Sequence, residues 1–91
     1  GVEGLARAAA ADYAKRGIQV NVISPGLVDT PLSAHLLSNE QSRAVSEAMH
    51  PVGSIGNADD IASVAEWLIK DAPDWMTGDI IPVDGGLTNL K

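Results

Sequence analysis

The chain has 91 residues and a formal net charge of −6, because 12 Asp and Glu outnumber 6 Lys and Arg. This length allows at most one small domain. An acidic chain with no basic cluster is not expected to bind nucleic acid. Zero cysteines exclude disulfides, thiolate zinc sites and cysteine nucleophiles. The sequence shows neither an apolar stretch of membrane-spanning length nor a secretion signal at its start, so the expected location is cytoplasmic.

Residues 2–16 are predicted to form a helix that stops at Gly17. Glu3 and Arg7 are an i,i+4 pair, and small alanine side chains would let another helix approach closely. The side chains expected on one packed face are Val2, Leu5, Ala9 and Tyr13.

Residues 18–23 form a short β-branched apolar run, which predicts a buried strand that ends at Ser24. Pro25 cannot donate a ladder hydrogen bond, and Gly26 lets the backbone turn and approach another molecule closely. Ligands of open α/β sheets bind outside the carboxyl ends of the strands. Residues 25–31 are therefore the predicted place for a ligand.

The segment 31–57 has a weaker pattern, which predicts two short helices followed by breaks at Pro51, Gly53 and Gly56. Residues 38–41 resemble a capping box, with Ser38 as the cap of the second helix. A loop with helical pieces is expected to be the mobile part of the fold.

Residues 58–70 are predicted to form a helix capped by Asn57, with Asp59 and Asp60 in the first turn, where the helix dipole favours anions. Adjacent helix positions diverge, so these two carboxylates are not interpreted as an acid/base pair. The expected buried stripe consists of Ile61, Val64, Ala65, Leu68 and Ile69.

Residues 79–83 are predicted to form a second strand, and Pro82 places it at a sheet edge. Strand, crossover helix and strand make a parallel βαβ unit. Two parallel strands leave an unpaired outer edge and do not form a stable open sheet. The chain is therefore expected to be the C-terminal portion of a doubly wound sheet whose earlier strands pair with residues 18–23.

Four motifs, in order and spacing, resemble the short-chain dehydrogenase/reductase family. They are Gly1-Val2-Glu3-Gly4-Leu5, Asn21-Val22-Ile23-Ser24-Pro25-Gly26-Leu27-Val28-Asp29-Thr30, Ala58-Asp59-Asp60-Ile61-Ala62, and Thr77-Gly78 through Val83-Asp84-Gly85-Gly86. The resemblance implies an α/β, Rossmann-like fold with the order helix, strand, helical loop, helix and strand. It divides this part of a dinucleotide-binding domain into a helix (1–17), a strand and cofactor loop (18–30), a substrate lid (31–57), and a helix with an edge strand (58–91).

The resemblance also implies NAD or NADP as cofactor. The Val28 backbone would hydrogen-bond the nicotinamide carboxamide, and the Thr30 hydroxyl would reach the carboxamide or the pyrophosphate. Pro25 and Gly26 would shape the turn, and Leu27 would flank the ring. The alternative is that residues 29–31 merely cap the next helix. The apolar residues assigned to the substrate lid are Leu32, Leu36, Leu37 and Met49.

No catalytic residue is assigned to this chain. The family's catalytic Tyr and Lys lie four positions apart, whereas Tyr13 has Lys15 two positions on and Gly17 four positions on, so Tyr13 is expected to be a packing residue. By resemblance the catalytic pair would lie just upstream of Gly1. Ser54 stands where many relatives carry Arg, which puts any interaction of that Arg in doubt.

Other kinds of site have little support. His35 and His50 lie fifteen positions apart in a flexible stretch, with no neighbouring carboxylate at a metal-ligand spacing, so they are expected to be partly exposed histidines rather than metal ligands. Ser24, Ser33 and Ser38 lack a Gly-x-Ser-x-Gly setting and fit strand ends and caps better than a hydrolase triad.

The favoured hypothesis is therefore a C-terminal segment of an NAD(P)-dependent oxidoreductase that transfers hydride between nicotinamide and a small alcohol or carbonyl substrate. The complete protein is expected to be a homodimer or homotetramer, to which residues 61–90 contribute, and the 91-residue piece alone is expected to be inactive. The alternative is a non-catalytic truncated remnant that acts as an oligomerisation or interaction module. The choice between NAD and NADP and the identity of the substrate are not encoded in these residues.

Overall fold

The structure, a computed structural model, describes residues 1–90, so Lys91 of the segment 58–91 lies outside the described residues. Helices and short strands are mixed along the chain. The elements are α1 (Val2–Tyr13), the 3-10 turn η1 (Ala14–Arg16), β1 (Val22–Pro25), β2 (Val28–Asp29), α2 (Ala34–Leu37), α3 (Glu40–Met49), β3 (Gly56–Asn57), α4 (Ala58–Lys70) and β4 (Ile80–Val83).

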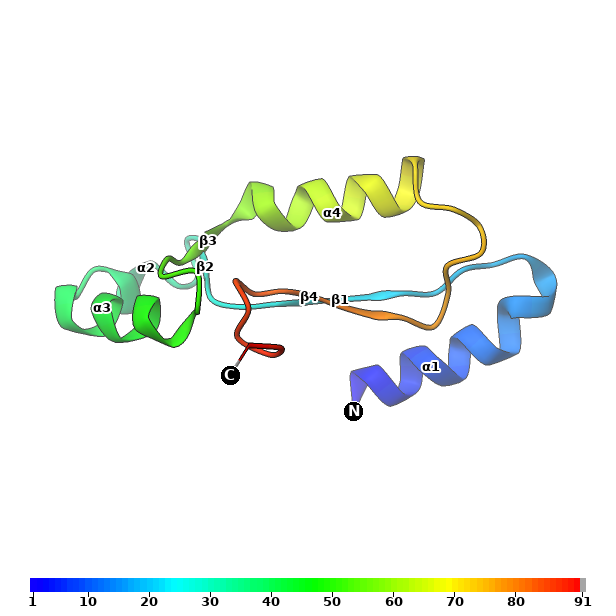
Figure 1. The fold of residues 1–91 in the computed structure, drawn as a ribbon, viewed down its shortest axis with the longest axis horizontal. Coiled ribbons are helices and arrows are strands. Elements are labelled where there is room, and N and C mark those ends of the chain that lie inside the picture. Colours follow the sequence, from blue (N-terminus) through cyan, green and yellow to red (C-terminus); the bar gives the residue numbers. More distant parts are fainter. Residues whose placement is uncertain (91) are drawn as a thin grey trace.

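Strands β1 and β4 pair in parallel, with Val22 opposite Ile80 and Pro25 opposite Val83. In Figure 1, α4 runs along one side of this strand pair and α1 lies on the other side, while α2 and α3 gather at one end. The prediction of an α/β fold with parallel strands joined by a crossover helix is confirmed.

The first strand is shifted relative to its predicted bounds, because it covers 22–25 rather than 18–24. The backbone N–H groups of Val22 and Gly26 both donate to β4, at 2.9 and 3.1 Å. Alternation along the strand turns the nitrogen of Pro25 to the opposite edge, where a missing N–H costs no bond to β4.

Residues before the strand contact a turn instead of a strand. The Val20 N–H donates to the Thr77 hydroxyl at 3.0 Å, and the Asn21 side chain bonds the backbone of Met76 and Asp79 at 3.2 and 3.0 Å. Together with the backbone bond from the Gly78 N–H to the Val20 carbonyl at 2.8 Å, these side-chain bonds hold residues 20 and 21 against the turn, and strand pairing begins at Val22.

The two long helices form where the sequence predicts them. The first, α1, continues into the 3-10 turn η1, which Gly17 ends with a φ of 74°, in the left-handed region that favours glycine. Asn57 and Asp60 form a reciprocal capping box at the start of α4. The predicted Ser38 cap is wrong, because the Asn39 side chain accepts from the Ser42 N–H and caps α3, while the Ser38 hydroxyl donates to the His35 carbonyl.

Few apolar side chains are buried within residues 1–90. The fully buried apolar residues are Ala10 and Leu37, and Ala10 faces the close turn at Gly78. The packed face predicted for α1 is wrong for the described residues, since Val2 and Leu5 are 74% and 73% exposed.

Two further predicted core positions are also exposed. Ile69 of the predicted α4 stripe is 84% exposed. Tyr13 is exposed too, with the guanidinium of Arg16 at 5.6 Å from its ring centroid, so its predicted packing role is not seen within residues 1–90.

Candidate functional site

The candidate site lies where β1 ends and the chain passes into the loop from Pro25 to Thr30. Gly26 sits in a narrow place at the start of this loop. A Cβ atom built on Gly26 would lie 2.8 Å from His50 Nε2 and 3.0 Å from the Asp84 Cα atom. Its φ does not lie in the left-handed region, so glycine is required here by space rather than by backbone conformation.

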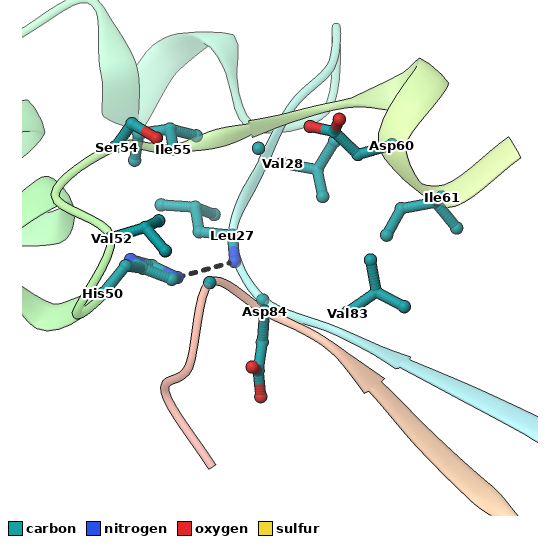
Figure 2. Close-up of a pocket in the computed structure, with 13 residues that line it drawn as sticks. Leu27, Val28, His50, Val52, Ser54, Ile55, Asp60, Ile61, Val83 and Asp84 are labelled. Carbon is teal, nitrogen blue, oxygen red and sulfur yellow. Dashed lines mark hydrogen bonds between the residues drawn. The ribbon is translucent and has the colours of Figure 1, made fainter. Parts of the chain in front are cut away.

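His50 holds the next residue of the loop, and the prediction of a partly exposed histidine is wrong. The side chain is buried, with 4% exposure. Its Nε2 atom accepts a hydrogen bond from the Leu27 N–H at 3.2 Å, and its Nδ1–H donates to the Ser46 carbonyl at 2.7 Å (Figure 2). These partners assign a neutral ring protonated on Nδ1.

The middle of the loop pairs with the end of the segment assigned to the substrate lid. Strand β2 runs parallel to β3, with Val28 opposite Gly56 and Asp29 opposite Asn57. The Gly56 N–H also donates to the Leu27 carbonyl at 3.1 Å. Because Asn57 caps α4, this short ladder joins the loop to the start of that helix.

Thr30 closes the loop through Ser33. The Ser33 hydroxyl donates to the Val28 carbonyl at 2.6 Å and accepts from the Thr30 N–H at 3.0 Å. The Thr30 hydroxyl in turn lies 3.4 Å from the Ser33 N–H, which is a weak bond. This bond agrees in part with the capping alternative, although α2 begins only at Ala34, after Ser33.

A cavity of about 270 Å³ adjoins the loop. Gly26, Leu27 and Val28 line it, whereas Pro25 and Thr30 do not. Figure 2 shows further lining residues from three other parts of the chain: His50, Val52, Ser54 and Ile55 before β3, Asp60 and Ile61 on α4, and Val83 and Asp84 at the end of β4.

The four residues assigned to the lid do not line this cavity. Leu37 is buried, whereas Leu32 is 96% exposed and Leu36 and Met49 are also exposed. Leu36 instead lines two shallow depressions beside α3. Their assignment to a substrate lid stays a prediction.

Asp84 also lines the cavity, and its carboxylate points away from the other lining side chains (Figure 2). Its carboxylate accepts from the Thr88 hydroxyl at 2.6 Å and from the N–H groups of Thr88 and Gly86, each at 3.1 Å. The Thr88 hydroxyl, followed by these backbone N–H groups, holds the pKa of Asp84 below its ordinary value of 3.8, against the opposing effect of burial. The carboxylate is therefore a structural anchor of the closing turn rather than a free base.

Within residues 1–90, no group of three His, Asp or Glu side chains is placed to hold a metal ion. None of the helices in this described part combines the length and apolar character needed to cross a bilayer.

A family model described as "Enoyl-(Acyl carrier protein) reductase" matches residues 1–88. The chain therefore belongs to the short-chain dehydrogenase/reductase family, as its motifs predict. The match covers the whole loop, α4 and β4.

Curated and solved relatives agree with this assignment. The chain is 41% identical over 88 residues to 3beta-hydroxysteroid dehydrogenase 1 of Eggerthella lenta, and the match covers 97% of this chain and 34% of that protein. The solved structure of 4-hydroxyisoleucine dehydrogenase complexed with NADH superimposes with a TM-score of 0.92 at 33% identity, covering 99% of this chain and 37% of the other.

ElxO with NADP bound gives a TM-score of 0.86 at 27% identity, covering 96% of this chain and 36% of the other. Both forms of the nicotinamide dinucleotide thus occur among the structural relatives, and NAD(P) is the cofactor of the family. The chain spans about a third of the length of the proteins that it matches.

Proposed function

We propose that residues 25–30 form the nicotinamide side of the cofactor site in an NAD(P)-dependent dehydrogenase. The observation that carries this proposal is that hydrogen bonds from three other parts of the chain hold the loop. His50 binds Leu27, Gly56 pairs with Val28, and Ser33 bonds both Val28 and Thr30. A loop held in this way presents its polar groups in one arrangement, which is what orienting a reactive ring requires.

The residues of the loop fit a nicotinamide head. The Val28 backbone and the Thr30 hydroxyl offer donors and acceptors suited to a carboxamide, Leu27 offers an apolar side chain to a ring, and Pro25 and Gly26 set the turn. The neighbouring cavity of about 270 Å³ lies at the small end of ligand sites, so it suits one end of a dinucleotide rather than the whole molecule.

A bound nicotinamide would supply hydride transfer to or from the carbon of an alcohol or carbonyl substrate. The part of this chain is to bind the carboxamide, fix the ring orientation and keep the loop rigid. Val28 and Thr30 would make the polar contacts, while Gly26 keeps room for His50. Proton transfer to the substrate oxygen is assigned to residues outside this chain, since Tyr13 lacks the Lys partner that the family uses.

The remaining roles are part of the same proposal. The segment 31–57 would cover the substrate, with Leu32, Leu36, Leu37 and Met49 as its apolar surface. The complete protein would be a cytoplasmic homodimer or homotetramer, with residues 61–90 in its assembly. The chain alone would not catalyse hydride transfer. Exposed Val2 and Leu5 on α1 suit coverage by further polypeptide.

The proposed function is tested in the full-length protein that carries this sequence. Thr30→Val removes the hydroxyl and keeps the shape, whereas Thr30→Ser keeps the hydroxyl. We expect Thr30→Val to weaken NADH or NADPH binding about tenfold, the effect of one lost hydrogen bond in a closed site, and Thr30→Ser to bind almost as well as the wild type. Titration calorimetry measures both affinities.

A wild-type protein that binds neither NADH nor NADPH would contradict the proposal. An intact mass equal to that of this chain would then favour the interaction-module alternative.

A further inference from the structure

We propose that His50 is a positioning residue that fastens α3 to the backbone of the loop at Leu27, so that the segment assigned to the substrate lid and the loop assigned to the nicotinamide keep one relative position. The two ring nitrogens bond two different parts of the chain. Nδ1–H donates to Ser46 inside α3, and Nε2 accepts from Leu27, which lies 23 positions away from His50 in the sequence. The link to the nicotinamide rests on the proposed function of the loop. The contact between α3 and the loop through His50 does not depend on that function.

The backbone around His50 is arranged for this contact. His50 ends α3 in an extended conformation, with φ −97° and ψ 118°. Pro51 disfavours helical backbone for the residue before it, so the chain turns away from the helix at this point. The local sequence thus favours the extended backbone that His50 adopts at this point.

Gly26 leaves room for the ring, and Gly85 lies beside the Cβ atom of the same residue at an ordinary contact distance. A Cβ atom on Gly26 would lie 2.8 Å from Nε2, and a Cβ atom on Gly85 would lie 3.5 Å from the His50 Cβ atom. The imidazole is therefore enclosed between the end of β1 and the turn after β4, and it is shielded from solvent (Figure 2). In this enclosed place a lost acceptor leaves the Leu27 N–H without its partner, which is costly.

The hydrogen bond from Leu27 to His50 lies next to the residue proposed to bind the nicotinamide. Leu27 immediately precedes Val28, whose backbone is proposed to bind the carboxamide. Release of the Leu27 N–H would let the loop move at that point, while the β2–β3 pair would still hold Val28 and Asp29. We therefore expect loss of His50 to loosen the loop without unfolding it.

Two substitutions separate the two nitrogens of the ring. His50→Asn keeps a side-chain amide near Nδ1, where it can donate to the Ser46 carbonyl, but it has no atom near Nε2. His50→Gln places a side-chain oxygen near Nε2, where it can accept from the Leu27 N–H. His35→Asn changes an exposed histidine on α2 and serves as the matched control.

The first measurement is hydrogen–deuterium exchange in the full-length protein, followed on peptides that cover residues 24–30. We expect His50→Asn to accelerate amide exchange there about tenfold, and His50→Gln and His35→Asn to exchange at nearly the wild-type rate. Equal exchange in His50→Asn and the wild type, or equal acceleration in His50→Asn and His50→Gln, would overturn the proposal, because the ring would then serve packing alone.

The second measurement concerns the cofactor. We expect His50→Asn to raise the KM for the dinucleotide about tenfold, with a smaller effect on kcat, and His50→Gln to restore it. Accelerated exchange in His50→Asn with no binding of NADH or NADPH by the wild type would support the fastening and contradict the proposed function. Accelerated exchange with an unchanged KM would overturn the coupling of His50 to the cofactor.

Discussion

Gly26 lies at a position where the structure leaves no room for a Cβ atom. The imidazole of His50 and the Cα and Cβ atoms of Asp84 lie 2.8 to 3.0 Å from the site where a Cβ atom would stand. A flexible side chain could move aside, but a Cα atom at the end of β4 cannot do so without shifting the strand. The position is therefore more restrictive than a glycine required only by its φ angle.

We predict that Gly26→Ala lowers the free energy of unfolding of the full-length protein by about 1–3 kcal/mol, the usual cost of overpacking. Denaturant unfolding measures this change. His50→Ala removes one of the two obstacles but leaves the Asp84 Cα atom at 3.0 Å, so the two substitutions should be less than additive. Strict additivity would show that the His50 ring does not restrict this position.

Asp84 gives the protein a predictable response to acid. The folded-state pKa lies below the unfolded value, so the ionised carboxylate stabilises the fold above the ordinary pKa. That contribution is lost as the pH falls through the folded-state pKa. We expect Asp84→Asn to lower the Tm at neutral pH and to reduce the fall in Tm between roughly pH 5 and pH 3.

Thr88→Val is the matched variant for this prediction, because the Thr88 hydroxyl is the largest cause of the lowered pKa. It should weaken the acid response in the same direction as Asp84→Asn. The prediction fails if the Tm of the wild type and of Asp84→Asn show the same pH dependence.

At the scale of the elements, local signals predict the helices well. Gly17, Asn57 and Asp60 act through bonds to near neighbours in the chain, so their roles follow from sequence spacing alone. The parallel pairing of the two apolar strands also follows, because parallel strands need a long crossover connection and the predicted helix between them supplies one.

The same reasoning fails where a contact joins distant positions. The bond from Leu27 to His50 spans 23 positions, and the histidine pair has no metal-ligand spacing that would draw attention to it. The one available signal is the position of His50 directly before Pro51 at the end of a predicted helix, which fixes its backbone but names no partner. Asn39 was missed as the α3 cap because Ser38 beside it has the same capping preference.

At the scale of the whole molecule, the described chain is open rather than compact. Its radius of gyration is 15.4 Å and its extents are 49 × 24 × 23 Å. A compact domain of this length has a radius of gyration of about 12 Å. The elongated shape in Figure 1 and the scarcity of buried apolar side chains agree with a sheet that further strands would widen.

We therefore predict that a peptide of residues 1–91 alone unfolds in urea with little cooperativity, because its buried surface is too small to support a sharp transition. Trp67 and Trp75, the second of which is 96% exposed, report on this state through their fluorescence. We expect emission typical of water-exposed indole in the peptide and a blue shift for Trp67 in the full-length protein. The peptide should oxidise no alcohol with NAD or NADP. A sharp two-state transition of the peptide would instead show that residues 1–91 form a self-sufficient core, and the exposed faces of α1 and α4 would then need another explanation.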